Sequence, residues 1–310
     1  MGLRLDVRLR ENQRRLQDVN DRRTQVIGEE ARAELLLEAM PYIEKYQNRI
    51  LVIKYGGNAM LGDDFKWSVM RDLTLLRFVG IKIVLVHGGG PEISQTLDRM
   101  GIQSRFVNGL RYTDEQTAEV VRMVLAGKVN KELVHILGAQ GAKAMGICGI
   151  DGKMLDCEKE SEELGFVGKI KKVNTTIIED ALNAGYLPVI STVGYDDEGH
   201  IYNVNADTAA SAIAGELKAE SLILMTDIRG LLRDKGREDS LIKKVYVSDI
   251  PSLINEGVIS GGMIPKVNCC KDTIRNGVTR VFIIDGRVKH SVLLELLSDE
   301  GLGTMFVKGD

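Results

Sequence analysis

The sequence has little of what marks several large classes of protein. Among its 310 residues there are four cysteines and five prolines, and only 5% of the residues are aromatic. No two cysteines form a CxxC pair, so we expect neither a zinc site nor a thiol redox motif. Four free thiols fit a reducing, cytoplasmic setting. No apolar run reaches the roughly 18 residues that a membrane-spanning helix needs, so no membrane partner is expected.

An excess of charge of either sign is also missing. Lys and Arg number 41 against 44 Asp and Glu, a formal net charge of −3, whereas a dedicated nucleic-acid binder is usually clearly basic. The first residues, MGLRLDVRLREN, contain no apolar core and do not resemble a secretory signal. The length fits two domains or one large α/β unit. No low-complexity tract separates domains.

The beginning of the chain differs from the rest. Residues 1–28 form an arginine-rich charged arm with few hydrophobic residues, for which we expect a solvated helix or a frayed tail. Residues 29–47 predict a helix, because Leu36, Met40 and Ile43 recur at helical spacing. Pro41 is expected to kink or divide that helix.

From residue 48 onward, short apolar runs alternate with helical patterns. Strands that are apolar throughout indicate a parallel sheet covered on both faces by helices. A further strand-rich stretch at 165–173 predicts a hairpin. The apolar runs lie at 50–53, 81–86, 144–148, 187–190, 222–225 and 280–284, and helical stretches between them lie at 65–79, 91–100, 114–125, 207–217 and 266–276.

Glycines follow several of the apolar runs, at the sheet edge where such folds bind ligands. A glycine-rich turn into a helix presents N–H groups to a phosphate or carboxylate, although tight turns alone would also explain the glycines. Neither GxxxxGK[ST] nor a GxGxxG after the first strand is present, which argues against a P-loop and an NAD-binding fold. The residues concerned are Lys54, Gly56 and Gly57, then Gly88, Gly89 and Gly90, and then Asp227 and Gly230.

Four polar residues elsewhere are candidates for the same ligand site. Arg111 lies among apolar residues and glycines, where it can clamp a carboxylate; a surface ion pair is a serious alternative. Asn205 and Asp207 precede a helix of small residues, and either is a plausible plain N-cap. Lys266 begins a helix after two glycines and opposes the helix dipole, so it needs a partner such as a phosphate or an aspartate.

These segments together resemble the amino-acid kinase family over roughly residues 29–306, and within it the branch that acts on N-acetyl-L-glutamate. The resemblance implies an open αβα sandwich with a mainly parallel sheet. It implies an acetylglutamate-binding and dimerisation lobe at 48–217 and an ATP-binding lobe at 218–310. The matching segments are VIKYGGNAM (52–60), LVHGGGPEI (85–93), NGLRYTD (108–114), NVNADTAA (203–210), GGMIPKV (261–267) and EGLGTM (300–305).

The resemblance also implies a reaction, the transfer of phosphate from ATP to the γ-carboxylate of N-acetyl-L-glutamate in arginine biosynthesis. A carboxylate is already ionised at neutral pH, so no general base is required. Mg²⁺ would bridge the ATP phosphates with few protein ligands, and no metal-binding residues are expected. The implied catalytic residues are Lys54, Asp207, Lys266 and Gly57, the substrate-binding residues Gly88, Gly89, Gly90, Arg111 and Asn203, and the nucleotide-binding residues Gly56, Asp227, Gly230, Leu231, Ser260 and Gly261.

The helix at 29–47 resembles that of arginine-inhibited hexamers built as trimers of dimers. The implied arginine site comprises Lys218, His290, Glu295 and Gly301, where an ordinary charged surface is a close alternative. Similar kinases of phototrophs bind a PII signalling protein, a partner for which no feature of this chain provides support. Two other functions stay open, namely a kinase for a related acylamino acid such as an aminoadipate derivative, and a non-catalytic arginine sensor. A difference of one methylene is worth only about 1–3 kcal/mol, too little to separate the substrates by sequence.

Overall fold

A computed structural model of the chain describes residues 28–60, 62–234, 236–299 and 301–309. The charged arm predicted at 1–28 lies outside these residues, apart from Gly28. The chain divides into two units, residues 1–45 and 46–310, which are described separately. Within the described residues, no helix combines the length and the apolar character that crossing a membrane requires.

The first unit contains helix α2 (Glu29–Tyr46), which carries Pro41 in its interior. The helix runs through Pro41 without a break, so Pro41 does not divide it, and the kink given as the alternative stays a prediction. A proline removes one backbone hydrogen bond, and the neighbouring turns keep theirs. Four large apolar side chains of α2 are exposed, namely Leu35, Leu36, Leu37 and Met40.

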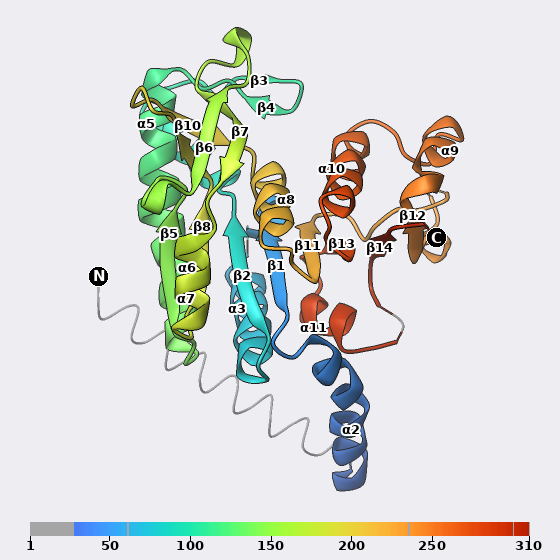
Figure 1. The fold of residues 1–310 in the computed structure, drawn as a ribbon. Coiled ribbons are helices and arrows are strands. Elements are labelled where there is room, and N and C mark those ends of the chain that lie inside the picture. The colour runs from blue at the N-terminus through green and yellow to red at the C-terminus, as the bar shows by residue number, and fades with distance from the viewer. Residues whose placement is uncertain (1–27, 61, 235, 300, 310) are drawn as a thin grey trace. The chain divides into compact units, whose positions relative to one another are not determined.

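The second unit is built on a sheet of eight described strands in the order β12-β14-β13-β11-β1-β2-β8-β5. All neighbouring pairs are parallel except β13 with β14 (Figure 1). The sheet is therefore mainly parallel, as predicted. Its strands are β1 (Ile50–Tyr55), β2 (Lys82–His87), β5 (Ala144–Cys148), β8 (Leu187–Ser191), β11 (Ser221–Thr226), β12 (Lys244–Tyr246), β13 (Arg280–Asp285) and β14 (Thr304–Val307).

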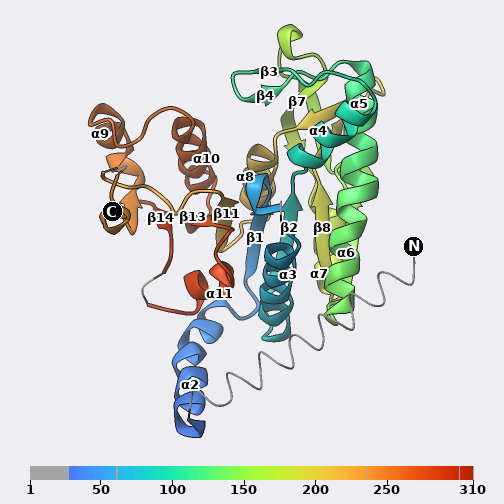
Figure 2. The ribbon, with the colours of Figure 1, turned by 180° about the vertical axis from the view of Figure 1, so that it is seen from behind.

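Helices cover both faces of this sheet. Nearly every residue of its central strands is therefore buried, and nearly all of them are apolar. One core forms beneath α7 (Thr176–Asn183), α8 (Ala206–Glu216), α9 (Ile250–Asn255) and α10 (Met263–Arg275). The other core forms beneath α3 (Asp63–Phe78), α4 (Gly90–Arg99), α5 (Glu115–Arg122), α6 (Asn130–Ala139) and α11 (Ser291–Leu296), and Figure 2 shows α3 and α6 in front of the strands.

Two smaller sheets lie beyond the main one. A closed four-stranded barrel joins β6 (Leu155–Lys159), β7 (Val167–Val173), β9 (Val193–Tyr195) and β10 (Ile201–Val204), and a two-stranded sheet joins β3 (Phe106–Val107) and β4 (Leu110–Arg111). The segment predicted as a hairpin at 165–173 is a single strand, β7, so a hairpin within those bounds is wrong. β7 is instead the second strand of an antiparallel pair with β6, the strand immediately before it in the chain, and it pairs parallel with β10.

Single-turn helices connect several elements: η1 (Gly57–Met60), η3 (Asp151–Lys153), η4 (Glu162–Leu164), η5 (Glu238–Ser240) and η6 (Val247–Asp249). The helix predicted at 114–125 runs further than expected. It passes from α5 into a π-helix, η2 (Met123–Val129), and then directly into α6.

Candidate functional site

Two lysines from distant parts of the chain meet one aspartate. Lys54 lies near the end of the central strand β1, and Lys266 lies in the first turns of α10. Their Nζ atoms approach different oxygens of Asp207, Lys54 at 2.9 Å from Oδ1 and Lys266 at 2.9 Å from Oδ2. The partner that Lys266 requires against the helix dipole is thus Asp207.

The residue that caps α8 leaves the Asp207 carboxylate available to pair with the two lysines. Asn205 is the N-cap, and its Oδ1 accepts the backbone N–H groups of Asp207 and Thr208 at 3.0 and 3.1 Å. Because Asn205 caps the helix, the Asp207 carboxylate is left to face the two ammonium groups. The alternative that Asp207 is itself the cap is therefore wrong.

The electrostatics of this cluster follow from its burial. The side chains of Lys54 and Asp207 are only 9% and 17% exposed. Burial by itself would raise the pKa of Asp207, but the ammonium groups of Lys54 and Lys266 outweigh it and lower the pKa to about 2. Asp207 is consequently ionised at every physiological pH, and the cluster carries a net positive charge.

Lys54 opens into a cavity of about 200 Å³. The cavity is lined by the two glycine segments that follow β1 and β2, by one arginine and by the strand that leads to α8. No acidic residue is among the lining residues, so the surroundings suit an anion. The lining residues that the sequence had already indicated as candidates are Lys54, Gly56, Gly57, Gly88, Gly89, Gly90, Arg111, Asn203 and Asn205.

The closeness of the glycine segments depends on their lack of side chains. A Cβ on Gly56 would lie 3.0 Å from Lys54 Nζ, and one on Gly89 would lie 2.6 Å from Leu125 Cδ2. Gly57 has φ +68°, in the left-handed region that favours glycine. Glycine at these positions therefore lets the backbone N–H groups approach the cavity.

Arg111 is buried, only 7% exposed, which excludes the alternative of a surface ion pair. Its guanidinium donates to the hydroxyls of Ser94 and Ser104, each at 2.8 Å, and to the carbonyl of Gly90 at 3.1 Å. It also lies 4.7 Å from the ring centre of Phe106. Burial lowers the pKa of Arg111, although a guanidinium stays charged at physiological pH. These contacts fix a cation at the cavity wall.

Asn203 faces the same cavity from β10. Its Nδ2 donates to the hydroxyl of Thr113 at 3.2 Å, which orients the amide. Ser94, Ser104 and Thr113 were not expected from the sequence. These hydroxyls orient Arg111 and Asn203 through contacts with residues distant in the chain, and no local sequence pattern predicts such contacts.

Apart from Gly56, which follows β1, the residues expected to bind nucleotide lie after β11 and before α10. Thr304 is fully buried; its hydroxyl accepts the backbone N–H of Leu231 at 2.8 Å, and a Cβ on Gly230 would lie 2.5 Å from it. Ser260 and Gly261 immediately precede the helix that carries Lys266, whereas Asp227 follows β11. Leu231 is buried, so its contribution to a ligand would come from its backbone.

The residues expected to bind arginine make contacts in three places. Lys218 donates to the Asn276 carbonyl at 3.4 Å. His290 Nδ1 lies 2.6 Å from the buried carboxylate of Asp72. The Glu295 carboxylate accepts the backbone N–H groups of Leu302 and Gly303 at 2.6 and 2.8 Å, next to Gly301. In the described structure, Glu295 thus holds the turn before β14 rather than standing free.

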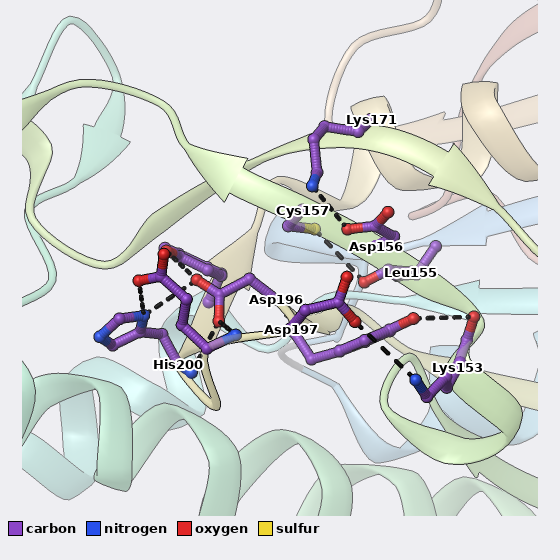
Figure 3. A network of polar contacts seen from close by, with 11 residues as sticks. Lys153, Leu155, Asp156, Cys157, Lys171, Asp196, Asp197 and His200 are labelled. Atoms are coloured by element: carbon purple, nitrogen blue, oxygen red, sulfur yellow. Dashed lines mark hydrogen bonds and ion pairs between the residues drawn. The ribbon is translucent and has the colours of Figure 1, made fainter.

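A separate polar cluster lies at the turn between β9 and β10 (Figure 3). Ligand atoms of Asp196, Glu198 and His200 lie within 4.8 Å of one another. Asp196 Oδ1 accepts the backbone N–H groups of Glu198 and His200, and Oδ2 accepts the Tyr202 hydroxyl and contacts His200 Nδ1. Burial would raise the pKa of Asp196, but these hydrogen bonds lower it to about 2. Since Asp196 is fully engaged, the cluster orders the turn.

Comparison with known proteins agrees with the geometry. Residues 49–285 match the Amino acid kinase family. The chain belongs to this family. Among curated relatives, the acetylglutamate kinase of Clostridioides difficile (strain 630) is 56% identical over 89% of this chain and 97% of its own length. That of Brachyspira hyodysenteriae is 54% identical over 91% and 99%. Within the amino acid kinase family, the chain is therefore an enzyme of the acetylglutamate kinase group.

Solved structures show the same fold. The protein smu.665 from Streptococcus mutans UA159 has a TM-score of 0.70 and 29% identity, covering 84% of this chain and 99% of that one. An N-acetylglutamate synthase from Neisseria gonorrhoeae, with coenzyme A and N-acetyl-glutamate, has a TM-score of 0.78 and 24% identity over 90% of this chain and 64% of that one. Carbamate kinase from Giardia lamblia with AMP-PNP has a TM-score of 0.61 and 16% identity over 84% and 99%. The last two support the amino acid kinase fold alone.

Proposed function

We propose that the protein transfers the γ-phosphoryl group of ATP to the γ-carboxylate of N-acetyl-L-glutamate, an early step of arginine biosynthesis. The observation that carries this proposal is the Lys54–Asp207–Lys266 cluster beside a glycine-lined, acid-free cavity. The names of relatives that are more than 50% identical over nearly their whole length support the same substrate.

The chemistry needs charge neutralisation rather than proton transfer. A carboxylate oxygen attacks the γ-phosphorus, the bond to the β-phosphate oxygen breaks, and ADP leaves with the electron pair, so that an acyl phosphate forms. The nucleophile is already anionic, so no residue has to remove a proton. Catalysis of this kind consists mostly of positioning and electrostatic stabilisation.

Each part of the site has a role in that scheme. Lys54 and Lys266 would contact the transferring phosphoryl group, and Asp207 holds both ammonium groups where that group passes. The N–H groups of Gly56, Gly57, Gly89 and Gly90 would bind the developing charge, whereas the N–H of Gly88 donates to the Tyr55 carbonyl at 2.9 Å. Arg111 would pair with the substrate α-carboxylate through the donors that Ser94, Ser104 and Gly90 leave free, and Asn203 would bond the substrate.

The donor set fits phosphate oxygens better than a metal ion. Both oxygens of Asp207 face ammonium groups, and the cavity is lined by cationic and N–H groups. When bound with ATP, Mg²⁺ would offset phosphate charge, held by phosphate oxygens and water. Residues 48–217 would then bind the acid and residues 218–310 the nucleotide, with Asp227, Gly230, Leu231, Ser260 and Gly261 in contact with it.

We also propose that L-arginine inhibits the enzyme through Lys218, His290, Glu295 and Gly301, in a homohexamer assembled through α2. Arginine would have to displace the Leu302 and Gly303 N–H groups from Glu295, so its binding would alter the turn before β14. The exposed side chains Leu35, Leu36, Leu37 and Met40 support a role of α2 in contacting a second copy.

One assay tests the reaction, its substrate and the inhibition by arginine. Purified protein is incubated with ATP, Mg²⁺, N-acetyl-L-glutamate and hydroxylamine, and the hydroxamate formed from the acyl phosphate is measured with and without L-arginine. We expect hydroxamate that falls when arginine is added. Hydroxamate that is indifferent to arginine would refute the inhibition alone, formation only with an aminoadipate derivative would change the substrate, and no product with any acid would refute the kinase.

A further inference from the structure

His87 is a buried histidine that the proposed chemistry does not use. It is the last residue of β2, immediately before the three glycines that line the cavity, and its side chain is fully buried. It pairs in register with Tyr55 of β1 and Ser191 of β8, so both sides of its backbone are held in the sheet.

The contacts of the imidazole define its protonation. Nδ1 lies 2.8 Å from the carbonyl oxygen of Gly88, which can only accept a hydrogen bond, so Nδ1 carries the proton. Nε2 lies 3.1 Å from Nδ2 of Asn130, which can only donate, so Nε2 is unprotonated. The ring is thus the neutral Nδ1–H tautomer.

The orientation of Asn130 does not depend on the histidine. Its Nδ2 also donates to the carbonyl of Val189 at 2.8 Å, and its Oδ1 accepts from Lys131 Nζ at 3.0 Å. A flipped amide would lose both contacts. Room for Asn130 comes from Gly146, where a Cβ would lie 2.0 Å from Asn130 Oδ1.

The hydrogen bond from His87 has a consequence on the other side of the peptide. In a trans peptide the carbonyl oxygen and the following N–H point in opposite directions. With its oxygen drawn toward the buried imidazole, the Gly88–Gly89 peptide turns the Gly89 N–H away from His87, and both glycines line the cavity.

The π-helix η2 supports this arrangement from behind. It places Leu125 and Val129 against Gly89, where a Cβ would meet them at 2.6 and 3.4 Å. Asn130 follows directly as the first residue of α6. π-Helical turns are rare and are frequently found at functional sites. The π-helical turn thus places Val129, which packs against Gly89, directly before Asn130, which donates a hydrogen bond to His87.

We propose that His87 is a positioning residue for phosphoryl transfer: held by Asn130 as the neutral Nδ1–H tautomer, it aims the Gly89 N–H at the oxyanion that develops in the cavity. The role of the N–H rests on the proposed kinase function. Burial lowers the pKa of His87 to about 4, a fall that the Gly88 hydrogen bond opposes and the Lys131 charge supports. The ring is thus neutral throughout the physiological pH range, and its contacts with Gly88 and Asn130 select the Nδ1–H tautomer.

The first test observes the ring in the full chain without any assay of activity. Nitrogen-15 spectra of histidine-labelled protein are recorded from pH 8 to pH 5. The chain has four histidines, so single variants of His135, His200 and His290 assign His87 by elimination. We expect a protonated Nδ1 and an unprotonated Nε2 at every pH. An Nε2–H tautomer, or an imidazolium above pH 6, would overturn the proposal whether or not the chain is a kinase.

The second test separates positioning from packing. His87→Asn keeps a donor at the place of Nδ1, whereas His87→Gln keeps only an acceptor at the place of Nε2, and each loses one buried hydrogen bond. Loss of an oxyanion donor costs about 10²–10³ in kcat. We expect His87→Gln to lower kcat at least about tenfold more than His87→Asn, with KM values within about threefold of each other. The exposed His135→Gln on α6 is the control.

Equal kcat in the two His87 variants, or kcat losses that follow their melting temperatures, would indicate a structural role and refute positioning. If wild-type protein forms no hydroxamate, the proposed function fails, while the tautomer measurement still decides whether the His87–Asn130 device exists. Should neither variant fold, the wild-type spectra alone decide the tautomer on which the proposal depends.

Discussion

Replacing Asp207 by asparagine should destabilise the protein in a pH-dependent way. The carboxylate is held between two ammonium groups, each at 2.9 Å, and they lower its pKa from an ordinary 3.8 to about 2. At about 1.4 kcal/mol per pKa unit, this difference is worth about 2 kcal/mol of folding free energy. Breaking a buried ion pair typically costs about 3–5 kcal/mol, so we expect a loss of about 2–5 kcal/mol at pH 7.

The sign of the pH dependence follows from the lowered pKa. The stabilisation is fully present above the unfolded-state pKa near 4 and is lost as the pH falls toward 2, because protonation of the native carboxylate removes its charge. About half of the ionisation contribution should be gone by pH 3. The difference between wild type and Asp207→Asn should therefore narrow between pH 7 and pH 3.

Urea unfolding followed by circular dichroism measures this difference. With an m-value of about 2–3 kcal/mol/M, a loss of about 2 kcal/mol shifts the midpoint by about 1 M. Asp239→Asn is the matched control, because Asp239 pairs with Arg237 at the exposed surface and should leave the midpoint unchanged. An Asp207→Asn midpoint equal to that of wild type at pH 7, or a gap that widens at pH 3, would refute the electrostatic account.

Three further substitutions test the other parts of the site. Lys54→Ala should lower kcat by about 10²-fold or more with little change in KM for ATP, and near-normal turnover would contradict its role. Arg111→Lys should raise KM for acetylglutamate about tenfold, because lysine cannot reproduce the fork that contacts Ser94 and Ser104; an unchanged KM would exclude the clamp. Asn205→Ala removes the cap of α8 and should cost about 1 kcal/mol in urea unfolding, which a stability equal to wild type would disprove.

Much of the main sheet could be predicted from the sequence, because burial on both faces leaves an unmistakable apolar run in each central strand. The barrel strands could not. β6 and β7 carry several exposed residues, β9 and β10 are only three and four residues long, and two of the pairings, β7 with β10 and β6 with β9, join segments far apart in the chain. The π-helix was missed for a related reason, since MVLAGKV has no local signal that separates it from an α-helix. Its residues Leu125 and Val129 pack against Gly89, a contact that only the folded chain forms.

For the candidate site, the sequence indicates which types of residue take part but not where they lie in the fold. Asn205 and Asp207 are both good N-caps, so local rules leave the choice open. Only the contacts in the structure show that Asn205 caps the helix and that Asp207 faces Lys54 and Lys266. For Arg111 the sequence indicates a cation but not its burial, which depends on Ser94 and Ser104. Residues that support others are hidden from sequence reasoning, because their partners are distant; His87 and Asn130 are 43 positions apart.

The arrangement of charge explains why the carboxylate of Asp207 lies between the ammonium groups of Lys54 and Lys266. A phosphoryl transfer between two anions requires positive charge at the meeting point, yet two ammonium groups brought together in a buried site repel each other before any substrate arrives. Asp207 offsets that repulsion, because each of its two oxygens faces one of the lysines. It is not among the residues that line the cavity, so its own charge does not face the ligand. Asp207 therefore holds the Nζ atoms of Lys54 and Lys266 close together, each 2.9 Å from one of its oxygens. In the proposed reaction, the negative charge of the transition state would meet both lysines without reorganisation, which is where electrostatic catalysis is most effective.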